Sequence, residues 1–249
     1  MTSTGPRMYH EFADWFHLLT APEEYAEEAG FYFQAAAGAL GRTPRSWLEL
    51  GSGGGNNASH YAQWVDGDVV LSDRSEQMLA LSERINPGLE HVAGDMLELR
   101  LGRTFEVVFV HDAASYLVSE HEVRRLAATL RAHCEPGGVT VVCPDATAET
   151  LTFETDHGGH DGDGRAMRYL EWTTPGPPGS HTYFADYAYL YHIDGQPPRV
   201  EFDRHVNGAL PQAVWLRALR EAGFEAWTAP FVHSEVPDGG VIFVGRLPT

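Results

Sequence analysis

Between residues 46 and 145, short apolar segments alternate with amphipathic segments of helical period. The apolar segments are SWLEL, VVLS, HVAG, FEVVFV and GVTVVCPD, and helical stretches such as SEQMLALSER lie between them. Ser119 followed by Glu122 forms a capping box, which predicts where the fourth helix of this region begins. The alternation is typical of a parallel sheet with helices on both faces, so we predict an α/β fold.

The remaining parts of the chain have other patterns. Residues 10–40 carry aromatic positions at helical spacing and predict two N-terminal helices. In HTYFADYAYLYHI the period changes to two, which places four tyrosines on one face: Tyr183, Tyr187, Tyr189 and Tyr191. With RAMRYLEW and PPRVEFDRHV this segment predicts a small inserted antiparallel sheet. A helix that ends near Gly223 and two closing strands follow, which gives the core sheet seven strands.

The composition and the net charge indicate which kinds of molecule the protein binds. Of 249 residues, 43% are apolar and 21% are charged, as in an ordinary globular domain. Seventeen basic against 35 acidic residues give a formal charge of −18, which repels nucleic acid and anionic lipid. We therefore expect no nucleic-acid or membrane partner, and a neutral or cationic small molecule fits better. No apolar run reaches the roughly 18 residues of a membrane helix, so a cytoplasmic location is expected. Cys134 and Cys143 are too few for a disulfide framework and predict buried apolar positions.

The most informative segment is the glycine run that follows the first strand. Glu49 is followed by Gly51, Gly53 and Gly55 at alternate positions, and such glycines let a ligand approach the backbone at the sheet edge. Asn56 stands where the dinucleotide fingerprint needs glycine, so a nicotinamide oxidoreductase is disfavoured. A nucleotide-like ligand is expected here. The alternative is a strand-to-helix turn that needs positive φ only.

Two further segments strengthen this interpretation. Asp73 ends the second strand, where a carboxylate can accept both hydroxyls of a ribose. Ser75 is placed to cap the next helix, and Met78 on that helix can cover an adenine face. After the third strand, Asp95 offers a carboxylate to an exocyclic amine and Met96 offers an apolar wall. Asp73 could instead serve only to start its helix.

The segments 49–55, 73–79 and 94–96, in this order and spacing, resemble the class I S-adenosylmethionine (SAM)-dependent methyltransferases. The segments 24–29 and 115–117 and the late insertion are more loosely similar to amino-sugar N-methyltransferases of natural-product biosynthesis. This resemblance implies a Rossmann-like seven-stranded sheet whose last strand is antiparallel. It also implies one methyltransferase domain over 1–249. Its parts would be a helical lid (1–45), a cofactor-binding core (46–145), an inserted acceptor-side sheet (146–208) and a C-terminal helix with closing strands (209–249).

The resemblance also implies roles for individual residues. SAM, and its product S-adenosylhomocysteine (SAH), would contact these positions: Tyr25, Glu49, Gly51, Gly53, Gly55, Asp73, Arg74, Met78, Asp95, Met96 and His111. The glycine loop would meet the methionine part, Asp73 the ribose, and Asp95 with Met96 the adenine. Tyr25 matches a tyrosine that helps to hold the amino-acid end of the cofactor.

Catalytic candidates follow the fourth strand. His111 and Asp112 are expected at the pocket edge, where they contact the acceptor or form a structural pair, and Tyr116 matches an acceptor-facing position of the sugar enzymes. The acceptor candidates lie on the N-terminal helices and the inserted strands: Tyr9, Trp15, Arg168, Trp172, Tyr187, Arg204 and His205. Phe16 could join Tyr9 and Trp15 in closing over the site, because aromatic faces attract a sulfonium. Simple packing explains these aromatic residues equally well, and the tyrosine face could also form a dimer interface.

One cluster has the chemistry of metal ligands: His157, His160, Asp161 and Asp163. A glycine-rich loop that closes over substrate, or a solvated connector, fits it better, and no metal is expected. We therefore predict a SAM-dependent methyltransferase that acts on a small molecule, at nitrogen rather than at oxygen. The tyrosine face is also compatible with a homodimer. One alternative is a small-molecule O-methyltransferase, with or without the assistance of a metal ion. The other is a scaffold that binds the cofactor without transferring methyl groups.

Overall fold

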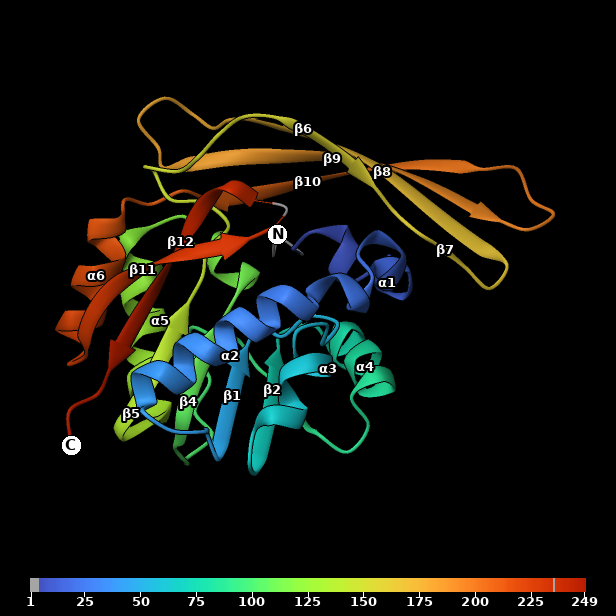
Figure 1. The fold of residues 1–249 in the computed structure, drawn as a ribbon. Coiled ribbons are helices and arrows are strands. Elements are labelled where there is room, and N and C mark those ends of the chain that lie inside the picture. The colour runs from blue at the N-terminus through green and yellow to red at the C-terminus, as the bar shows by residue number, and fades with distance from the viewer. Residues whose placement is uncertain (1–4, 235) are drawn as a thin grey trace.

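A computed structural model describes residues 5–234 and 236–249 and contains two sheets (Figure 1). The core sheet has the order β11-β12-β5-β4-β1-β2-β3. Its strands are β1 (Ser46–Leu50), β2 (Asp68–Asp73), β3 (Glu90–Ala93), β4 (Phe105–Val110), β5 (Cys134–Val142), β11 (Glu225–His233) and β12 (Val236–Arg246). β1 to β5 are parallel, while β12 runs antiparallel to both β5 and β11. The predicted seven-stranded sheet with an antiparallel last strand is therefore confirmed.

Helices cover both faces of the core sheet because its central strands are apolar on both sides. On β4, Val108 and Val110 pack under α5 and α6, while Val107 and Phe109 pack under α2 and α3. The helices are α2 (Ala26–Leu40), α3 (Ala58–Tyr61), α4 (Glu76–Ile85), α5 (Glu120–His133) and α6 (Gln212–Glu221). The predicted caps are present: Ser75 Oγ accepts from Met78 N, and Ser119 Oγ accepts from Glu122 N. Cys134 and Cys143 are free and buried, as expected.

The N-terminal segment differs from its prediction. One long helix, α2, is present, but residues 7–25 form three 3₁₀ turns (Arg7–Tyr9, Ala13–Trp15 and Pro22–Tyr25) and the single-turn α1 (Phe16–Leu19). Thr20 is extended and Pro22 has no backbone N–H to donate, so a continuous helix cannot pass this point. The aromatic residues of these turns pack upward against the second sheet rather than along a helix stripe.

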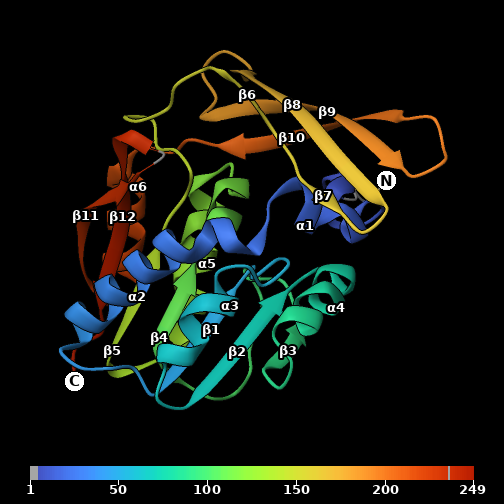
Figure 2. The same ribbon diagram turned by 45° about the vertical axis from the view of Figure 1, so that its right-hand side comes forward.

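The second sheet lies across the carboxyl edge of the core (Figures 1 and 2). It consists of β6 (Thr155–Gly158), β7 (Asp161–Gly162), β8 (Arg165–Pro175), β9 (Thr182–Ile193) and β10 (Arg199–Gly208), all paired antiparallel. The tyrosine face of β9 points toward the N-terminal turns, where Tyr189 and Tyr191 are buried with Met8. Packing of sheet on turns, not a dimer contact, therefore accounts for this face.

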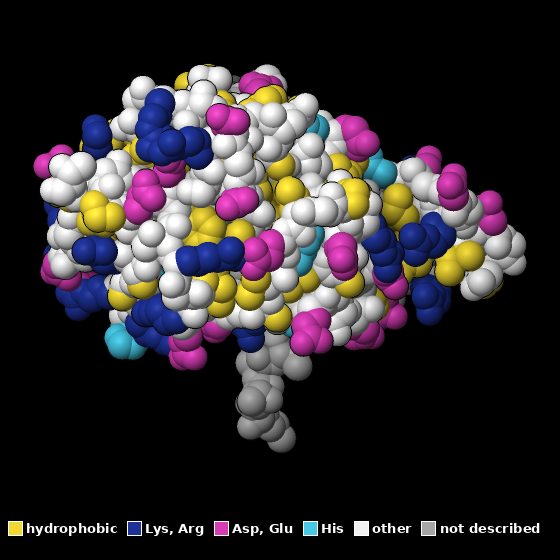
Figure 3. All heavy atoms as spheres, turned by 90° about the horizontal axis from the view of Figure 1, so that it is seen from below, with side chains coloured by type: hydrophobic (Ala, Val, Ile, Leu, Met, Phe, Trp, Pro, Cys, Tyr) yellow, Lys and Arg dark blue, Asp and Glu magenta, His cyan; other side chains and the backbone are white. Residues whose placement is uncertain are grey.

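The opposite face of the second sheet is apolar and exposed. Trp172 is 60% exposed and Phe202 is 70% exposed, and Leu170, Leu190 and Val200 accompany them. On the face of the molecule shown in Figure 3, acidic and basic side chains are interspersed and do not gather into one basic patch. Within the described residues, no helix is long and apolar enough to span a bilayer.

Candidate functional site

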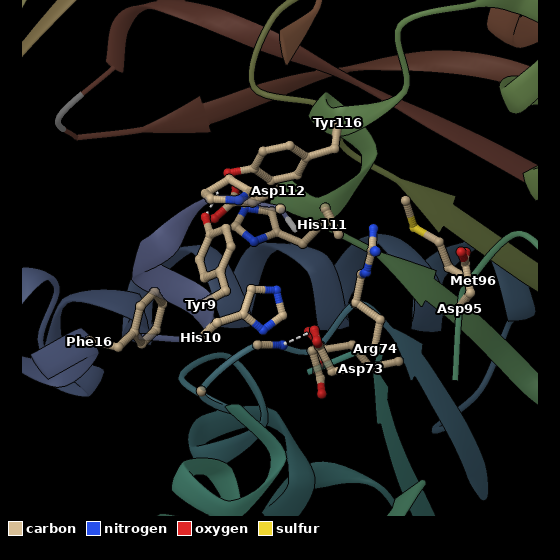
Figure 4. Close-up of a pocket in the computed structure, with 18 of the residues that line it drawn as sticks. Tyr9, His10, Phe16, Asp73, Arg74, Asp95, Met96, His111, Asp112 and Tyr116 are labelled. Atoms are coloured by element: carbon tan, nitrogen blue, oxygen red, sulfur yellow. Dashed lines mark hydrogen bonds and ion pairs between the residues drawn. The ribbon is translucent and has the colours of Figure 1, made fainter. Parts of the chain in front are cut away.

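A cavity of about 510 Å³ opens at the carboxyl edge of the core sheet. It forms there because β1, β2, β3 and β4 all end at this edge and each is followed by a polar loop. Most of the predicted cofactor positions line it: Tyr25, Glu49, Gly51, Gly53, Asp73, Arg74, Asp95, Met96 and His111. Tyr9, Asp112, Tyr116 and Arg204 line it as well. Figure 4 shows Asp95 and Met96 at one end of this cavity and Tyr9, Asp112 and Tyr116 at the other.

The glycine loop both forms a turn with positive φ and exposes its backbone to a ligand, which are the two alternatives that the sequence left open. Gly51 has a φ of 70°, and a Cβ added to it would lie 2.3 Å from the Cβ of Ala113. Gly55 has a φ of 78°, and a Cβ added to it would lie 2.1 Å from Ser82 Oγ on α4. This end of the loop therefore faces α4, and Gly55 does not line the cavity. The loop therefore needs glycine for its turn, and at Gly51 and Gly53 it also exposes backbone to a ligand.

Asp73 is anchored from two sides. Its Oδ2 accepts from Gly53 N at 3.0 Å and its Oδ1 accepts from Ser75 N at 2.8 Å. Burial raises the pKa of this carboxyl, while the two backbone donors oppose the rise. Each oxygen keeps a further lone pair for a ligand, so the geometry suits two hydroxyls presented from the cavity.

Met78 lies elsewhere than expected. The residue is on α4, as the sequence predicts, but its side chain is fully buried beneath the glycine loop and does not line the cavity. Met96 is the methionine that does line it, next to Asp95. A buried Met at helical spacing thus supports the loop from below.

Glu49 is a buried carboxyl at the inner end of the cavity. Tyr61 Oη donates to it at 2.6 Å, and only 3% of the residue is exposed. Burial raises the pKa of Glu49 to about 7, and the tyrosine hydrogen bond limits the rise. A cationic group in the cavity would favour the ionised form of this carboxyl.

His111 is buried between carboxylates. Its Nε2 lies 2.8 Å from Asp112 Oδ1 and 3.6 Å from Glu28 Oε2, and Nδ1 lies 3.1 Å from the Asn57 amide. Burial alone would lower the pKa of His111, but Asp112 and Glu28 outweigh it and raise the pKa to about 10. Glu28 and Asn57 were not singled out from the sequence because they are 83 and 54 positions from His111. The signal for Asn57 was the pair of asparagines directly after the glycine run, and both are buried.

A chain of hydrogen-bonded side chains begins at the end of the cavity where Tyr9 and Tyr116 lie (Figure 4). Tyr9 Oη lies 2.7 Å from Tyr116 Oη, which lies 2.9 Å from His205 Nδ1. His205 Nε2 is 3.4 Å from Asp203 Oδ2, and His205 and the Asp203 side chain are both nearly inaccessible. Asp203 was not singled out from the sequence.

A second cavity, of about 940 Å³, lies between the N-terminal turns and the second sheet. Six carboxylates line it: Glu24, Glu28, Asp112, Glu154, Asp156 and Glu171. Tyr169 and Tyr187 also line it, and no Lys or Arg is among its described lining residues. Tyr25 and Asp112 line both cavities, so the two adjoin each other at these side chains.

Four predicted acceptor residues line neither cavity: Trp15, Arg168, Trp172 and His205. Trp15 packs on Tyr191 with ring centroids 4.7 Å apart. Arg168 forms an ion pair with Asp161 at 2.7 Å, and Trp172 lies on the exposed outer face. Arg204 reaches the first cavity, yet its guanidinium pairs with Asp186 at 2.6 Å.

The segment with metal-ligand chemistry is spread along β6 and β7. His160 Nε2 lies 3.2 Å from Glu24, and Asp161 is held by Arg168. Across the described part of the chain, no three His, Cys, Asp or Glu side chains are arranged to hold a metal ion. His157 lines the second cavity along with His160.

Comparison with known proteins defines the class. A family model described as a methyltransferase domain matches residues 48–138, which contain the glycine loop, Asp73 and Asp95. The solved structures with this fold include a SAM-dependent methyltransferase from Clostridium acetobutylicum, with a TM-score of 0.74 at 15% identity over 97% of this chain and 99% of that one. Residues 48–138 are thus similar to a methyltransferase domain, and the chain has the class I methyltransferase fold. The predicted fold class is confirmed.

More particular similarities point to sugar enzymes. The dTDP-3-amino-3,4,6-trideoxy-alpha-D-glucopyranose N,N-dimethyltransferase of Streptomyces venezuelae is 34% identical over 146 residues, which cover 57% of this chain and 60% of that protein. The DesVI structure from the same species has a TM-score of 0.81 at 24% identity and covers 96% of this chain and 98% of that one. The structure of the sugar N-methyltransferase KedS8 from Streptoalloteichus also has a TM-score of 0.81. It is 22% identical and covers 100% of this chain and 96% of that one. The looser resemblance predicted from the sequence is therefore confirmed.

Proposed function

We propose that this protein transfers a methyl group from SAM to an amine of a small amino sugar or a related amine-bearing molecule. The observation that carries this proposal is the second cavity, which six carboxylates line and which adjoins the first cavity at Tyr25 and Asp112. Carboxylates attract an ammonium and repel phosphate or carboxylate groups. The relatives with nitrogen acceptors support the same chemistry.

The residues of the first cavity fit SAM. We infer that Asp73 holds the ribose hydroxyls, that Asp95 and Met96 hold the adenine, and that Glu49 faces the ammonium of the methionine end. Gly51 and Gly53 provide the close backbone approach, since a Cβ at Gly51 would strike Ala113. When bound, SAM supplies a sulfonium methyl whose leaving group departs uncharged, so the protein mainly aligns the acceptor and excludes water.

Three parts of the chain enclose the acceptor in this proposal. The predicted lid is 1–45, of which residues 1–4 lie outside the described part of the chain, and residues 5–45 cover the core 46–145. The sheet within 146–208 forms the roof, and 209–249 completes the core. Tyr9, Tyr116 and Tyr187 face the acceptor, and His205 lies behind Tyr116 and is hydrogen-bonded to it. The His111–Asp112 pair fixes the wall between the two cavities. The paired His111 cannot serve as a base, because Asp112 and Glu28 keep it protonated near neutral pH.

The charge of the second cavity also bears on the form of the acceptor. The relative from Streptomyces venezuelae is named for a dTDP-linked sugar, which carries a diphosphate. Three arginines line the first cavity, Arg7, Arg74 and Arg204, and Arg7 and Arg204 are already paired with carboxylates. No arginine or lysine is among the described lining residues of the second cavity. We therefore propose that the amine enters the carboxylate-lined cavity and that any diphosphate stays outside it.

Methyl-deuterated SAM and a panel of acceptors test this function. The panel contains free 3-amino sugars, the same sugars as dTDP derivatives, and hydroxyl analogues without nitrogen, each run with and without a chelator. The expected result is label on nitrogen that is insensitive to chelation. Label on oxygen would support the O-methyltransferase alternative, and loss of that label on chelation its metal-assisted form. Tight SAH binding with no product from any acceptor would support the non-transferring scaffold.

We further propose a homodimer through the outer face of the second sheet. Trp172 and Phe202 are exposed there beside other apolar side chains, and such a patch favours association. Sedimentation should show a dimer that Phe202→Asp weakens, while Glu98→Gln on the core should leave it intact. A monomeric wild-type protein at tens of micromolar would contradict this proposal.

A further inference from the structure

An amine that binds among carboxylates arrives as an ammonium, and an ammonium has no lone pair with which to attack a methyl group. The carboxylates of the second cavity stabilise this protonated form. A site of this kind needs a group that removes one proton from the bound acceptor. His111 is unsuitable because its own pKa is raised to about 10 by Asp112 and Glu28, against the effect of burial. This inference rests on the proposed function.

We propose that Tyr9, Tyr116, His205 and Asp203 form a relay that takes a proton from the acceptor ammonium. Tyr9 and Tyr116 line the first cavity, and Figure 4 shows their hydroxyl ends meeting beside Asp112. The chain continues from Tyr116 Oη to His205 Nδ1 at 2.9 Å and from His205 Nε2 toward Asp203 Oδ2 at 3.4 Å. It therefore leads from the cavity wall to a buried imidazole and then to Asp203, a nearly inaccessible carboxylate that also lines the first cavity.

The hydrogen-bond directions agree along the whole chain. The ionised Asp203 carboxylate can only accept, and its Oδ2 also receives the Met8 N–H at 3.0 Å, so the ring proton that faces it is one on His205 Nε2. His205 Nδ1 is then an acceptor for the Tyr116 hydroxyl, and Tyr116 can in turn accept from Tyr9. His205 Nε2 has no closer partner among the described residues, which leaves Asp203 as the group that stabilises a charged imidazole.

The proton step is balanced. The acceptor N–H bond breaks and its electron pair remains on nitrogen, while the proton joins the Tyr9 oxygen. The Tyr9 hydroxyl proton passes to Tyr116, the Tyr116 hydroxyl proton passes to His205 Nδ1, and both tyrosines end neutral. Burial raises the pKa of both tyrosines, so they pass the proton on without holding a charge. His205 ends as an imidazolium beside Asp203.

Other groups near His205 do not replace Asp203. The Tyr187 ring lies 4.7 Å from the imidazole, centroid to centroid, and the Tyr9 ring lies 5.7 Å away. Glu171, on β8 beyond β9, also interacts electrostatically with His205, and it is engaged with Tyr187. Asp203 is therefore the carboxylate closest to the imidazole.

His205→Asn separates proton uptake from simple positioning. An asparagine oxygen can still accept from Tyr116 in place of Nδ1, but it cannot hold a proton near neutral pH. With a 3-amino sugar as acceptor, we expect kcat to fall about a hundredfold at pH 7. The ratio of wild-type to variant kcat should then shrink toward one as the pH rises and the amine loses its proton in solution. Affinity for SAH, measured by calorimetry, should not change.

His181 provides the matched control for His205→Asn. His181→Asn makes the same chemical change at an exposed histidine outside the relay and should leave the pH profile unaltered. A wild-type to variant ratio that stays constant from pH 6.5 to 9.5 would show a purely structural role for His205 and overturn the relay.

Imidazole ¹⁵N NMR tests the relay without turnover. With SAH bound, methyl transfer cannot occur, and addition of the 3-amino sugar should convert His205 from the neutral form with a proton on Nε2 to the imidazolium. Asp203→Asn should reduce this conversion. A His205 signal that stays neutral in the wild-type protein would overturn the proposal. If this conversion occurs with SAH but the same acceptor is not methylated when SAM replaces SAH, the proposed function alone is refuted.

Discussion

Glu49 gives the sharpest test of how the cofactor is held. Its carboxyl lines the first cavity and has a pKa of about 7 because of burial. If the ammonium of SAH pairs with Glu49, only the ionised carboxyl supports tight binding. Below pH 7 the affinity should therefore fall, because protonated Glu49 must lose its proton when the ligand binds.

The size of the effect follows from the fraction of ionised carboxyl. With a pKa of about 7, roughly 50% of Glu49 is ionised at pH 7 and roughly 9% at pH 6, so SAH should bind about fivefold more tightly at pH 7. Glu49→Gln should bind SAH at least about tenfold more weakly at pH 7.5, the value expected for a charge-assisted hydrogen bond. Its affinity should also lose most of the dependence on pH between 6 and 7. Isothermal calorimetry in one buffer series measures both effects.

Tyr61 provides the matched control. Tyr61→Phe removes the hydroxyl that donates to Glu49 at 2.6 Å, so the pKa of Glu49 should rise further and the affinity profile should move to higher pH. If Glu49→Gln keeps the full pH dependence of the wild type, another group is responsible and Glu49 is not the partner of the ammonium.

Two other predictions concern the scaffold of the site. Gly51→Ala places a Cβ 2.3 Å from that of Ala113 at a φ of 70°, so it should abolish SAH binding and cost roughly 2 kcal/mol of unfolding free energy; calorimetric binding at wild-type affinity would contradict this. Although burial opposes them, Arg42 and Arg45 lower the pKa of Glu106 from 4.5 to about 2. The contribution of Glu106 to the free energy of unfolding is therefore complete above pH 4.5 and is lost as the pH falls through 2. Glu106→Gln should therefore cost about 3 kcal/mol at pH 7 in urea unfolding and flatten the acid limb, and an unchanged acid limb would count against this ion pair.

The sequence was most informative where one segment determines its own structure. The strands of the core are buried on both faces, so continuous apolar runs such as FEVVFV revealed them. The glycine run, Asp73 and Asp95 could be predicted to share an edge because each directly follows a parallel strand. Caps at Ser75 and Ser119 depend on neighbours within three residues and were equally visible.

The remaining features depend on contacts that are distant in sequence. Phe12 and Trp15 have helical spacing, but their partner Tyr191 lies on β9, and this contact rather than a helix stripe fixes them. Met78 was placed on the correct helix, yet the direction of its side chain is set by the loop above it. The carboxylates of the second cavity come from the turn Pro22–Tyr25, α2, the loop after β4, the residue before β6, and strands β6 and β8. Their meeting could therefore not be inferred from spacing.

The docking of the N-terminal turns has a consequence for synthesis on the ribosome. Met8 is fully buried against β8 and β9, and its N–H binds Asp203, which is 195 positions later in the chain. At about 5–20 residues per second, roughly 10–40 s pass between translation of the two residues. During this interval the first aromatic turns emerge without their partner surface. These turns are thus made well before the strands against which they pack, and until then their apolar side chains lack the surface that buries them.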